Sequence, residues 1–444
     1  MKDTVVCVPL GNPLRKVRGG FALGVASLTL LLVLMLPFGA WATAREKVIY
    51  SFTGGNDGSS PIGILTLGKK GSLYGVASRG GTSENGVVFE LTPGAGGNWT
   101  ETVLYSFAGG SDGAFPVEGV IFDKAGNLYG VTQDGGGSGC FGGCGTVFEL
   151  TPGADGQWTE TVLHRFTGGS DGGEPNAILI FDSAGNLYGT TEAGGDASCD
   201  LGEFAGCGTV FELMPGKSGQ WTETVLHAFK GGSDGALPIF SGVIFDATGN
   251  LYGTTAVGGK YGIGTVFELM PAEGGKWKES ILHAFKGGSD GNNPATGLAL
   301  FEGNLYGTTY AGGSSSCGVS AGCGTVFQLK LNARGKWAKT VIHEFQGSDG
   351  IETFATPVFD KAGNLYGTTF EGGSGECNVC GTALELTPTA SGPWQETVLH
   401  DFGSQNDDAA TPFGGLIINK AGKLFGMTDG GGNDNAGAVY EITP

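Results

Sequence analysis

The sequence predicts an all-β protein, a seven-bladed β-propeller with four antiparallel strands in each blade. Three observations support this prediction: a unit of about sixty residues repeats seven times, each unit holds four short strand-like segments, and the two ends of the repeat region complement each other. The repeat is marked by the phrase GNLYG and its variants GSLYG and GKLFG. Its aromatic position is occupied by Tyr74, Tyr129, Tyr188, Tyr252, Tyr306, Tyr366 and Phe425.

The second unit shows the four segments most clearly, and we name them a to d. They are VEGVIFD (117–123), NLYGVT (127–132), GTVFELT (145–151) and WTETVLHRF (158–166). All four are rich in β-branched or aromatic residues and are bounded by Gly, Pro, Asp or Asn, as strands are. Short polar turns join a to b and c to d, so both pairs are predicted to be hairpins.

The ends of the repeat region predict how the ring closes. The region begins with EKVIYSF (46–52), which matches segment d, and ends with GAVYEITP, which matches segment c. We therefore expect the first strand to complete the last blade. The structural alternative, an open β-solenoid, would need polar caps at its ends instead. Residues 46–444 are thus predicted to form one propeller domain.

The runs GNLYGTT, GTVFEL and TVLHxF recur through the units, and in them the chain resembles the GloVer-type tandem-repeat proteins. The resemblance covers essentially all of residues 46–444. It implies an exported repeat protein of undetermined biochemical role, whose relatives often carry a C-terminal sorting anchor. This chain departs from that pattern at YEITP, which has no apolar tail, so free secretion is the expectation.

The N-terminal segment is predicted to be a cleaved signal peptide, residues 1–44. Three basic residues between positions 15 and 18 precede an apolar run from Phe21 to Phe38, and the small residues Ala42 and Ala44 follow it. This is the order of parts in a secretory signal. The alternative is an uncleaved membrane anchor, because 18 apolar residues are just long enough to span a bilayer. The expected location is therefore secreted, cell-surface or periplasmic.

Charge excludes two classes of partner. The formal net charge is −19, and removing residues 1–44, which carry a net +3, would make it −22. Such an acidic chain is not expected to bind nucleic acid, or a membrane beyond the signal segment. An extracellular polysaccharide or a protein is the expected partner, and the chain is expected to be a monomer.

Eight cysteines follow the signal segment, in four local pairs within the b-to-c loops of units 2, 3, 5 and 6. Zinc would need four converging ligands, and the sequence CNVC lacks the helix start that a thioredoxin-like site requires. Disulfides are favoured, because the count is even and an exported chain meets an oxidising space. The predicted pairs are Cys140 with Cys144, Cys199 with Cys207, Cys317 with Cys323, and Cys377 with Cys380.

Each d-to-a crossing carries an aspartate, at Asp57, Asp112, Asp171, Asp234, Asp290, Asp349 and, less regularly, Asp407. Two interpretations exist: a calcium site, with Asp112, Asp171, Asp234 and Asp290 as candidates, or an Asp-Gly turn that accepts backbone N–H groups. The turn is favoured, because calcium takes six to eight oxygens and each loop offers one carboxylate. No cofactor is expected. The five histidines all occupy the VLHxF or VIHxF position and are predicted to pack between blades.

Strand parity places the d-to-a crossings and the b-to-c loops on one face, which we call the variable face. Tyr261, Tyr310 and Phe370, from the b-to-c loops of units 4, 5 and 6, are the candidate sugar-binding residues there. The alternative is that each ring merely covers its own loop. Other residues that break the repeat on this face are Asp134, Glu192, Phe204, Lys260, Glu371 and Asp434.

The resulting functional prediction is a non-enzymatic binding or interaction module for an extracellular glycan or matrix polymer. The alternatives are an extracellular glycan hydrolase or lyase that uses carboxylates, and a purely structural surface protein. No nucleophile, base and orienting group stand out together, so no catalytic residue is predicted. An asymmetric acidic pocket near the ring axis would favour the enzyme, and an aromatic shelf would favour the binder.

Overall fold

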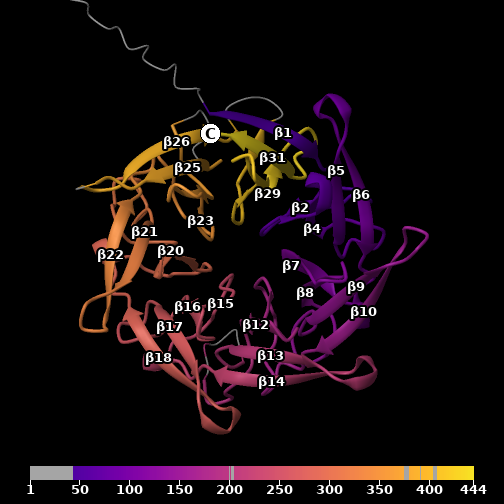
Figure 1. Cartoon of the computed structure of the whole chain (residues 1–444), viewed down its shortest axis with the longest axis horizontal. Coiled ribbons are helices and arrows are strands. Elements are labelled where there is room, and N and C mark those ends of the chain that lie inside the picture. Colours follow the sequence, from indigo (N-terminus) through magenta and orange to yellow (C-terminus); the bar gives the residue numbers. More distant parts are fainter. Residues whose placement is uncertain (1–43, 200, 202–204, 375–379, 391, 404–407) are drawn as a thin grey trace, which may run out of the picture. The chain divides into compact units, whose positions relative to one another are not determined.

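The protein forms a ring of seven small antiparallel sheets, which is the predicted seven-bladed β-propeller (Figure 1). The computed structural model describes residues 44–199, 201, 205–374, 380–390, 392–403 and 408–444. No α-helix occurs among them, and none of their helical segments is long and apolar enough to cross a membrane. The predicted signal segment lies outside the described residues. The repeat therefore folds as one all-β unit.

Each blade has an outer strand paired to a third strand, which correspond to segments d and c. The outer strands open at a tryptophan in five blades and carry the Tyr or His of the repeat. They are β6 (Trp99–Ser106), β10 (Trp158–Arg165), β14 (Trp221–Ala228), β18 (Trp277–Ala284), β22 (Trp337–Glu344), β26 (Gln395–Asp401) and β1 (Arg45–Ser51). The third strands are β5 (Val87–Pro93), β9 (Thr146–Pro152), β13 (Thr209–Pro215), β17 (Thr265–Pro271), β21 (Thr325–Leu331), β25 (Thr382–Thr387) and β31 (Ala438–Thr443).

The second strands contain the LYG motif, or LFG in the last blade, and in every blade except the second the inner strand is shorter than segment a predicted. The second strands are β4 (Leu73–Arg79), β8 (Leu128–Asp134), β12 (Leu187–Thr191), β16 (Leu251–Thr255), β20 (Asn304–Thr309), β24 (Leu365–Thr369) and β29 (Leu424–Thr428). The inner strands are β2 (Ser59–Pro61) with β3 (Thr66–Leu67), β7 (Ala114–Phe122), β11 (Ile180–Phe181), β15 (Ile244–Phe245), β19 (Ala299–Phe301), β23 (Val358–Phe359) and β28 (Ile417–Ile418). A two-stranded ribbon, β27 (Ala409–Ala410) with β30 (Gly430–Gly431), and seven short 3-10 turns complete the elements, the turns being η1 (Lys69–Gly71), η2 (Ala95–Gly97), η3 (Gly110–Asp112), η4 (Lys217–Gly219), η5 (Gly232–Asp234), η6 (Glu273–Gly275) and η7 (Gly288–Asp290).

Segment a is short because its first half leaves the sheet. In most blades a residue with positive φ precedes a proline there, as at Leu237 (φ 53°) and Thr411 (φ 55°). Proline also removes a ladder donor, so outside blade 2 regular pairing resumes only two or three residues before the a-to-b turn. In blade 2, where Phe115 precedes Pro116, β7 stays paired with β8 through a register shift between Val117 and Val120. The segment between the outer strand of one blade and the inner strand of the next therefore lies outside the sheet, and its side chains can make contacts with other blades.

The ring closes as predicted, with β1 as the outer strand of the last blade. It pairs antiparallel with β31, from Arg45 opposite Thr443 to Ser51 opposite Ala438. Figure 1 shows this strand, drawn in indigo, beside the yellow C-terminal strands. The two ends of the propeller thus share one sheet, in the order β1-β31-β29-β28.

Blades pack on each other through a repeated pair of rings. Phe52, which follows β1 and is fully buried, lies edge-to-face on Phe89 of the next blade, with ring centroids 5.1 Å apart. Edge-to-face aromatic pairs contribute beyond their buried area, by about 0.5–1.5 kcal/mol. The same arrangement recurs at Phe107 with Phe148, Phe166 with Phe211, Phe229 with Phe267, Phe285 with Phe327, and Phe402 with Tyr440.

The GNLYG motif is explained by its contacts within a blade. In the second blade the Asn127 amide donates to Asp123 and Glu149, and the Tyr129 hydroxyl donates to Glu149 at 2.6 Å. A Cβ on Gly130 would lie 2.6 Å from the Phe148 ring, so only glycine fits beside that ring. The motif is therefore a structural signature of the hairpin.

Candidate functional site

The d-to-a crossings and the b-to-c loops meet on one face, as strand parity predicts. Isolated antiparallel bridges join the two sets of loops at Ala236 with Val257 and at Ile351 with Glu371. These bridges fix the position of the loops relative to one another. The variable face is thus a connected layer of backbone in which side chains from crossings and loops can act together.

Three of the predicted disulfides are present in the b-to-c loops. They join Cys140 to Cys144, Cys199 to Cys207 and Cys317 to Cys323, with Cα atoms 5.0, 5.7 and 6.0 Å apart. Cys380 is also disulfide-bonded, and its predicted partner Cys377 lies outside the described residues. Disulfides persist in oxidising compartments, so they indicate an extracellular or periplasmic environment.

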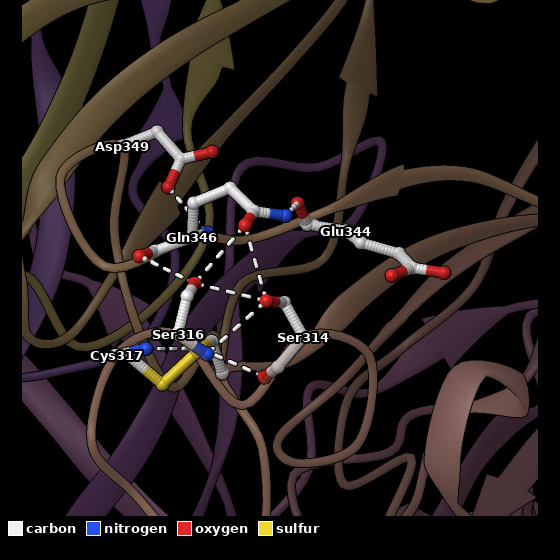
Figure 2. Close-up of a disulfide and its surroundings, with 7 residues drawn as sticks. Ser314, Ser316, Cys317, Glu344, Gln346 and Asp349 are labelled. Atoms are coloured by element: carbon white, nitrogen blue, oxygen red, sulfur yellow. Dashed lines mark hydrogen bonds between the residues drawn. A yellow bond between two sulfur atoms is a disulfide. The ribbon is translucent and has the colours of Figure 1, made fainter.

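The loop closed by Cys317 and Cys323 is held by a polar cluster. The hydroxyls of Ser314 and Ser316 both lie 3.0 Å from the Gln346 side-chain oxygen, and Ser316 also donates to the Gln346 carbonyl at 3.0 Å (Figure 2). Gln346 belongs to the next crossing, after strand β22. The disulfide loop is therefore fastened to the crossing.

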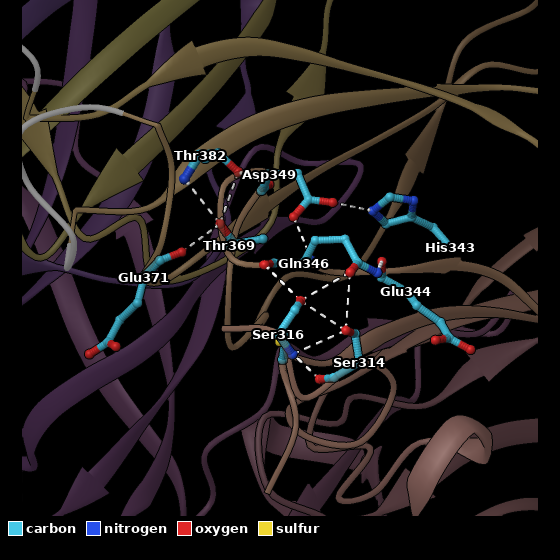
Figure 3. Close-up of polar contacts among 10 residues, drawn as sticks. Ser314, Ser316, His343, Glu344, Gln346, Asp349, Thr369, Glu371 and Thr382 are labelled. Carbon is cyan, nitrogen blue, oxygen red and sulfur yellow. Dashed lines mark hydrogen bonds and ion pairs between the residues drawn. The ribbon is translucent and has the colours of Figure 1, made fainter. Parts of the chain in front are cut away.

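The same network continues into the sixth blade (Figure 3). The Gln346 N–H donates to Asp349 at 2.7 Å, and the Thr382 hydroxyl donates to the Asp349 carbonyl at 2.9 Å. Thr382 and Thr369 share a hydroxyl contact of 2.9 Å, and Thr369 donates to the Glu371 carbonyl at 3.0 Å. The disulfide loop, the crossing and the strand ends thus form one hydrogen-bond network, which fixes the backbone of Glu371.

We expect the disulfides to contribute mainly local stability. Replacing both Cys140 and Cys144 by serine should lower the free energy of unfolding by about 2 kcal/mol, because so short a loop loses little chain entropy on closure. Replacing Cys199 and Cys207 should cost roughly 0.6 kcal/mol more, because that loop is longer. Urea unfolding of the two double variants measures this difference. Equal midpoints for both variants and the unmodified chain would contradict the expectation.

The aspartates of the crossings lie where an Asp-Gly turn places them. The Asp234 carboxylate accepts the Lys230 N–H at 2.7 Å, and Asp57 accepts the Thr53 N–H at 2.8 Å. Asp112, Asp171 and Asp290 accept the equivalent backbone N–H groups. In the last blade Asp408 contacts His400, so it takes the position predicted for Asp407, which lies outside the described residues.

Each of these aspartate carboxylates also contacts a tyrosine or histidine of the preceding outer strand. Tyr105 donates to Asp112 at 2.7 Å, and the Nε2 atoms of His227 and His343 lie 3.3 and 2.9 Å from Asp234 and Asp349. Each histidine ring also lies edge-to-face on the phenylalanine two residues later, as at His227 and Phe229. The histidines thus pack between blades with one hydrogen-bonding end, as predicted.

The sequence analysis missed a third partner of each aspartate, which comes from the outer strand of the next blade. Burial raises the pKa of this glutamate, and the neighbouring aspartate adds to the effect. At Glu101, Glu160, Glu223 and Glu279 the pKa reaches about 7. Burial likewise raises the pKa of Glu46 to about 7, while the charge of His400 lowers this pKa and the charge of Asp408 raises it. The signal was in the sequence, because this strand position is Glu in six units and Lys339 in one.

Two of the three predicted sugar-binding residues meet near the ring axis. Tyr310 and Phe370 both contact Phe354, with ring centroids 5.1 and 5.7 Å apart. Phe354 in turn stacks on Phe413 at 4.7 Å, and Phe240 contacts Phe413 at 5.1 Å. All five rings are partly exposed. We call these five residues the axial aromatic cluster.

The axial aromatic cluster draws on non-adjacent blades. Phe240 precedes the inner strand of blade 4, whereas Phe354 and Phe413 precede those of blades 6 and 7, and Phe240 lies 5.9 Å from Phe354. These three rings were not predicted, because they lie in the crossings and not in the b-to-c loops. Phe240 also holds a left-handed backbone conformation, with φ of 49°. Such conformations are enriched at ligand sites.

Carboxyl groups flank the axial aromatic cluster. The Tyr310 hydroxyl donates to Glu352, and burial together with this contact raises the tyrosine pKa to about 12. The Glu352 carbonyl accepts the Phe370 N–H at 2.9 Å, and Glu371 lies next in sequence. Burial and the charge of Glu352 raise the pKa of Glu371. The carboxyl groups of Glu352 and Glu371 therefore belong to the surroundings of Tyr310 and Phe370.

A second carboxyl group set lies in the crossings and loops of blades 2 and 3. The Asn176 amide donates to Glu192 at 2.6 Å, and burial, then the charge of Glu174, raises the pKa of Glu192 to about 7. Burial and the charge of Asp134 raise the pKa of Glu174 in turn. Asp134 and Glu192 were among the predicted repeat-breaking residues, and Glu174 and Asn176 were missed. Phe204 lies outside the described residues.

Tyr261 lies in a different place. Its ring is 46 % exposed and lies under the Lys260 ammonium, 5.2 Å from the ring centroid. It lines a groove of about 570 Å³ beside β18, together with Asp234 and Glu279. Among the described ring contacts it makes none with the axial aromatic cluster. The structure thus separates Tyr261 from Tyr310 and Phe370.

The repeat can now be compared with known proteins. The model of the Gloeobacter/Verrucomicrobia repeat matches residues 40–200, 145–321 and 316–444. The chain belongs to the Gloeobacter/Verrucomicrobia repeat family. No protein with a curated description matches it. A crystal structure of a protein of unknown function from Dyadobacter fermentans DSM 18053 is similar at 13 % identity with a TM-score of 0.44, over 90 % of this chain and 100 % of that one.

Membership of the Gloeobacter/Verrucomicrobia repeat family explains the fold and the spacing of the units. It assigns no ligand to the variable face. The contacts that differ between blades, above all the axial aromatic cluster, are therefore the basis for a functional proposal.

Proposed function

We propose that this chain is an exported, non-enzymatic binding module that takes a neutral polysaccharide on the variable face, at the axial aromatic cluster. The observation that supports the proposal is the meeting of five partly exposed rings, Tyr310, Phe354, Phe370, Phe413 and Phe240, beside carboxyl groups. Aromatic side chains supply a large apolar contact at low cost in conformational entropy.

The chemistry of a neutral sugar fits this surface. The C–H faces of a pyranose pack on aromatic rings, and its hydroxyls donate to carboxylates and carbonyls. Glu352 and Glu371 offer such acceptors beside Tyr310 and Phe370. A formal net charge of −19 disfavours anionic polymers. The signal-like segment 1–44 and the disulfides support export to a space where such polymers occur.

A binding screen tests this proposal. Affinity electrophoresis through gels that contain neutral polysaccharides should show retardation of the unmodified chain. The double variant Tyr310→Ala with Phe354→Ala should lose at least roughly ten-fold in affinity, because the central ring and its neighbour are removed. Unchanged retardation of this variant would contradict the proposal.

Two further variants separate loss of binding from loss of folding. Phe141→Ala removes a fully exposed ring on another b-to-c loop, so it should retain full affinity. Tyr310→Phe keeps the ring and removes the contact to Glu352, so it should retain most of the affinity. A thermal melt of each variant shows whether the propeller is intact. Tyr261→Ala, tested separately, shows whether the groove beside β18 contributes.

The glycan hydrolase is the second candidate, because Glu192 has the pKa of about 7 that a general acid needs. Its neighbour Glu174 supplies a second carboxyl group. Release of reducing ends from a bound polysaccharide, abolished by Glu192→Gln, would favour this candidate. Binding without release would favour the module.

A further inference from the structure

Seven equivalent junctions lie between the outer strands of neighbouring blades. Each joins the Tyr or His of one outer strand, the aspartate of the crossing that follows, and one residue of the next outer strand. The seven sets are Tyr50, Asp57 and Glu101; Tyr105, Asp112 and Glu160; His164, Asp171 and Glu223; His227, Asp234 and Glu279; His283, Asp290 and Lys339; His343, Asp349 and Glu396; and His400, Asp408 and Glu46.

Two of these junctions have the geometry of a metal site. The ligand atoms of His227, Asp234 and Glu279 all lie within 4.8 Å of one another, and those of His400, Asp408 and Glu46 do as well. The His164 and His343 junctions contain the same residue types, but among the described residues their ligand atoms do not come this close together. The Oε1 atoms of Glu279 and Glu46 are buried and have no hydrogen-bond partner, as at four other junctions, so the close approach of all three side chains is what distinguishes these two. A buried carboxylate oxygen without a partner is costly, and a cation would satisfy it.

The fifth junction shows directly that a positive charge fits at this place. There the glutamate is replaced by Lys339, whose side chain is only 3 % exposed. Its ammonium lies 3.2 Å from Asp290 Oδ1 and 5.0 Å from the centroid of the Phe285 ring. The ammonium thus occupies, in one blade, the position between aspartate and outer strand that a bound cation would occupy in the others.

The donor set selects the class of cation. One imidazole nitrogen and two carboxylates suit zinc and similar transition metals, which leave a fourth position for water. Calcium takes six to eight oxygens and is a poor match. Lys230 acts on the charge of Asp234, and Lys260 and Lys286 line the adjacent groove, so a bound ion has to be held by bonds to the nitrogen and oxygen donors and not by net charge.

An ion can reach the Asp234 junction from solvent. The groove of about 570 Å³ beside β18 is lined by Asp234 and Glu279, and also by Tyr261. Access and a set of deprotonable ligands are the conditions that a metal site must meet. At the Tyr-containing junctions the phenol replaces the imidazole, so those junctions lack the nitrogen donor.

We propose that the His227, Asp234 and Glu279 junction, and the His400, Asp408 and Glu46 junction, each bind one divalent transition-metal ion of the zinc class between neighbouring blades. These sites are distinct from the axial aromatic cluster. Metal binding clamps one outer strand to the crossing of the preceding blade. Either proposal can fail without the other.

Metal stoichiometry tests this proposal. The full chain, non-reduced and alkylated so that Cys7 cannot bind metal, is dialysed against micromolar zinc chloride, and bound zinc is counted by atomic emission. We expect two ions per chain. Glu279→Lys places at this junction the residue that blade 5 carries naturally, and should reduce the count to one. Lys339→Glu turns the fifth junction into a further His, Asp and Glu set, in which His283 Nε2 already lies 3.0 Å from Asp290, and should raise the count to three.

The matched control is Glu101→Lys, at a junction that has Tyr50 in place of histidine, and it should leave the count at two. A zinc count of zero for the unmodified chain would overturn the proposal, as would an unchanged count for Glu279→Lys. If Lys339→Glu fails to fold, the Glu279→Lys and Glu101→Lys pair still decides the outcome. Calcium in place of zinc should give no binding above background.

Discussion

In the presence of a chelator, the free energy of unfolding is expected to fall as the pH rises from 6.5 to 8. Burial raises the folded-state pKa of Glu46, Glu101, Glu160, Glu223 and Glu279 from 4.5 to about 7. A raised folded-state pKa means that the fold favours the protonated form. The resulting stability is complete below about 4.5 and is lost as the pH rises through about 7.

Other groups act in the opposite direction at lower pH. Burial lowers the pKa of His164 and His283, so their contribution is present above 6.5 and is lost as the pH falls. The contacts of Asp234 and Asp349 lower their pKa values, and this contribution is lost only in more acidic solution. The window from 6.5 to 8 therefore reports mainly on buried glutamates, which include Glu192 with a pKa raised by burial to about 7 and Glu118 with a pKa raised by burial to about 8.

The expected size is roughly 2 kcal/mol over this window for the five glutamates together, after halving for solvent screening of half-exposed groups. Urea midpoints measured at both pH values give the total change, which also contains the contributions of Glu118 and Glu192. Glu160→Gln with Glu223→Gln should remove roughly two fifths of the part that comes from the five glutamates, because glutamine does not ionise. Glu273→Gln, at an exposed turn, is the control. A pH profile that the double variant leaves unchanged would contradict the interpretation.

Deleting the closing strand should have the largest effect on stability. A chain that starts at Gly54 lacks β1 and Phe52, and losing the Phe52 ring alone is expected to cost about 3–5 kcal/mol. It also leaves β31 as an exposed edge, which promotes association. We expect a lower urea midpoint and oligomers on size exclusion.

The control for this deletion is a chain that starts at Ala44, which keeps β1 and should behave as the unmodified propeller. Adding a synthetic peptide of residues 44–53 to the shorter chain should restore the midpoint, because the peptide can pair with β31 as an added strand. If the chain that starts at Gly54 unfolds at the same urea concentration as the control, ring closure is not the stabilising contact.

The strands and the closure of the ring could be predicted because both depend on local patterns. GNLYG, GTVFEL and the Asp-Gly turns each specify a hairpin or turn through contacts between residues close in sequence, such as Asn127 with Asp123. The complementary ends at 46–52 and GAVYEITP then left one way to complete the last blade. The disulfides followed from spacing within single loops.

The extent of the inner strands was predicted correctly in blade 2 alone. Segment a was expected at 117–123, where β7 spans Ala114–Phe122, yet regular pairing spans two or three residues in most other blades. Period-two patterning cannot show where a proline and a positive φ interrupt a ladder. The correction matters, because the freed segments carry Phe240, Phe354 and Phe413 to the axial aromatic cluster.

The sequence by itself determined the seven blades, their strand order, the closing strand and the loops that contain the disulfides, because each depends on repeated short-range contacts. Only the tertiary structure decided which side chains meet across blades. Phe240 of blade 4 meets Phe354 of blade 6, a contact between non-adjacent blades that no periodicity reveals. Such contacts depend on the curvature of the ring, which brings crossings to the axis and places each outer strand against its neighbour.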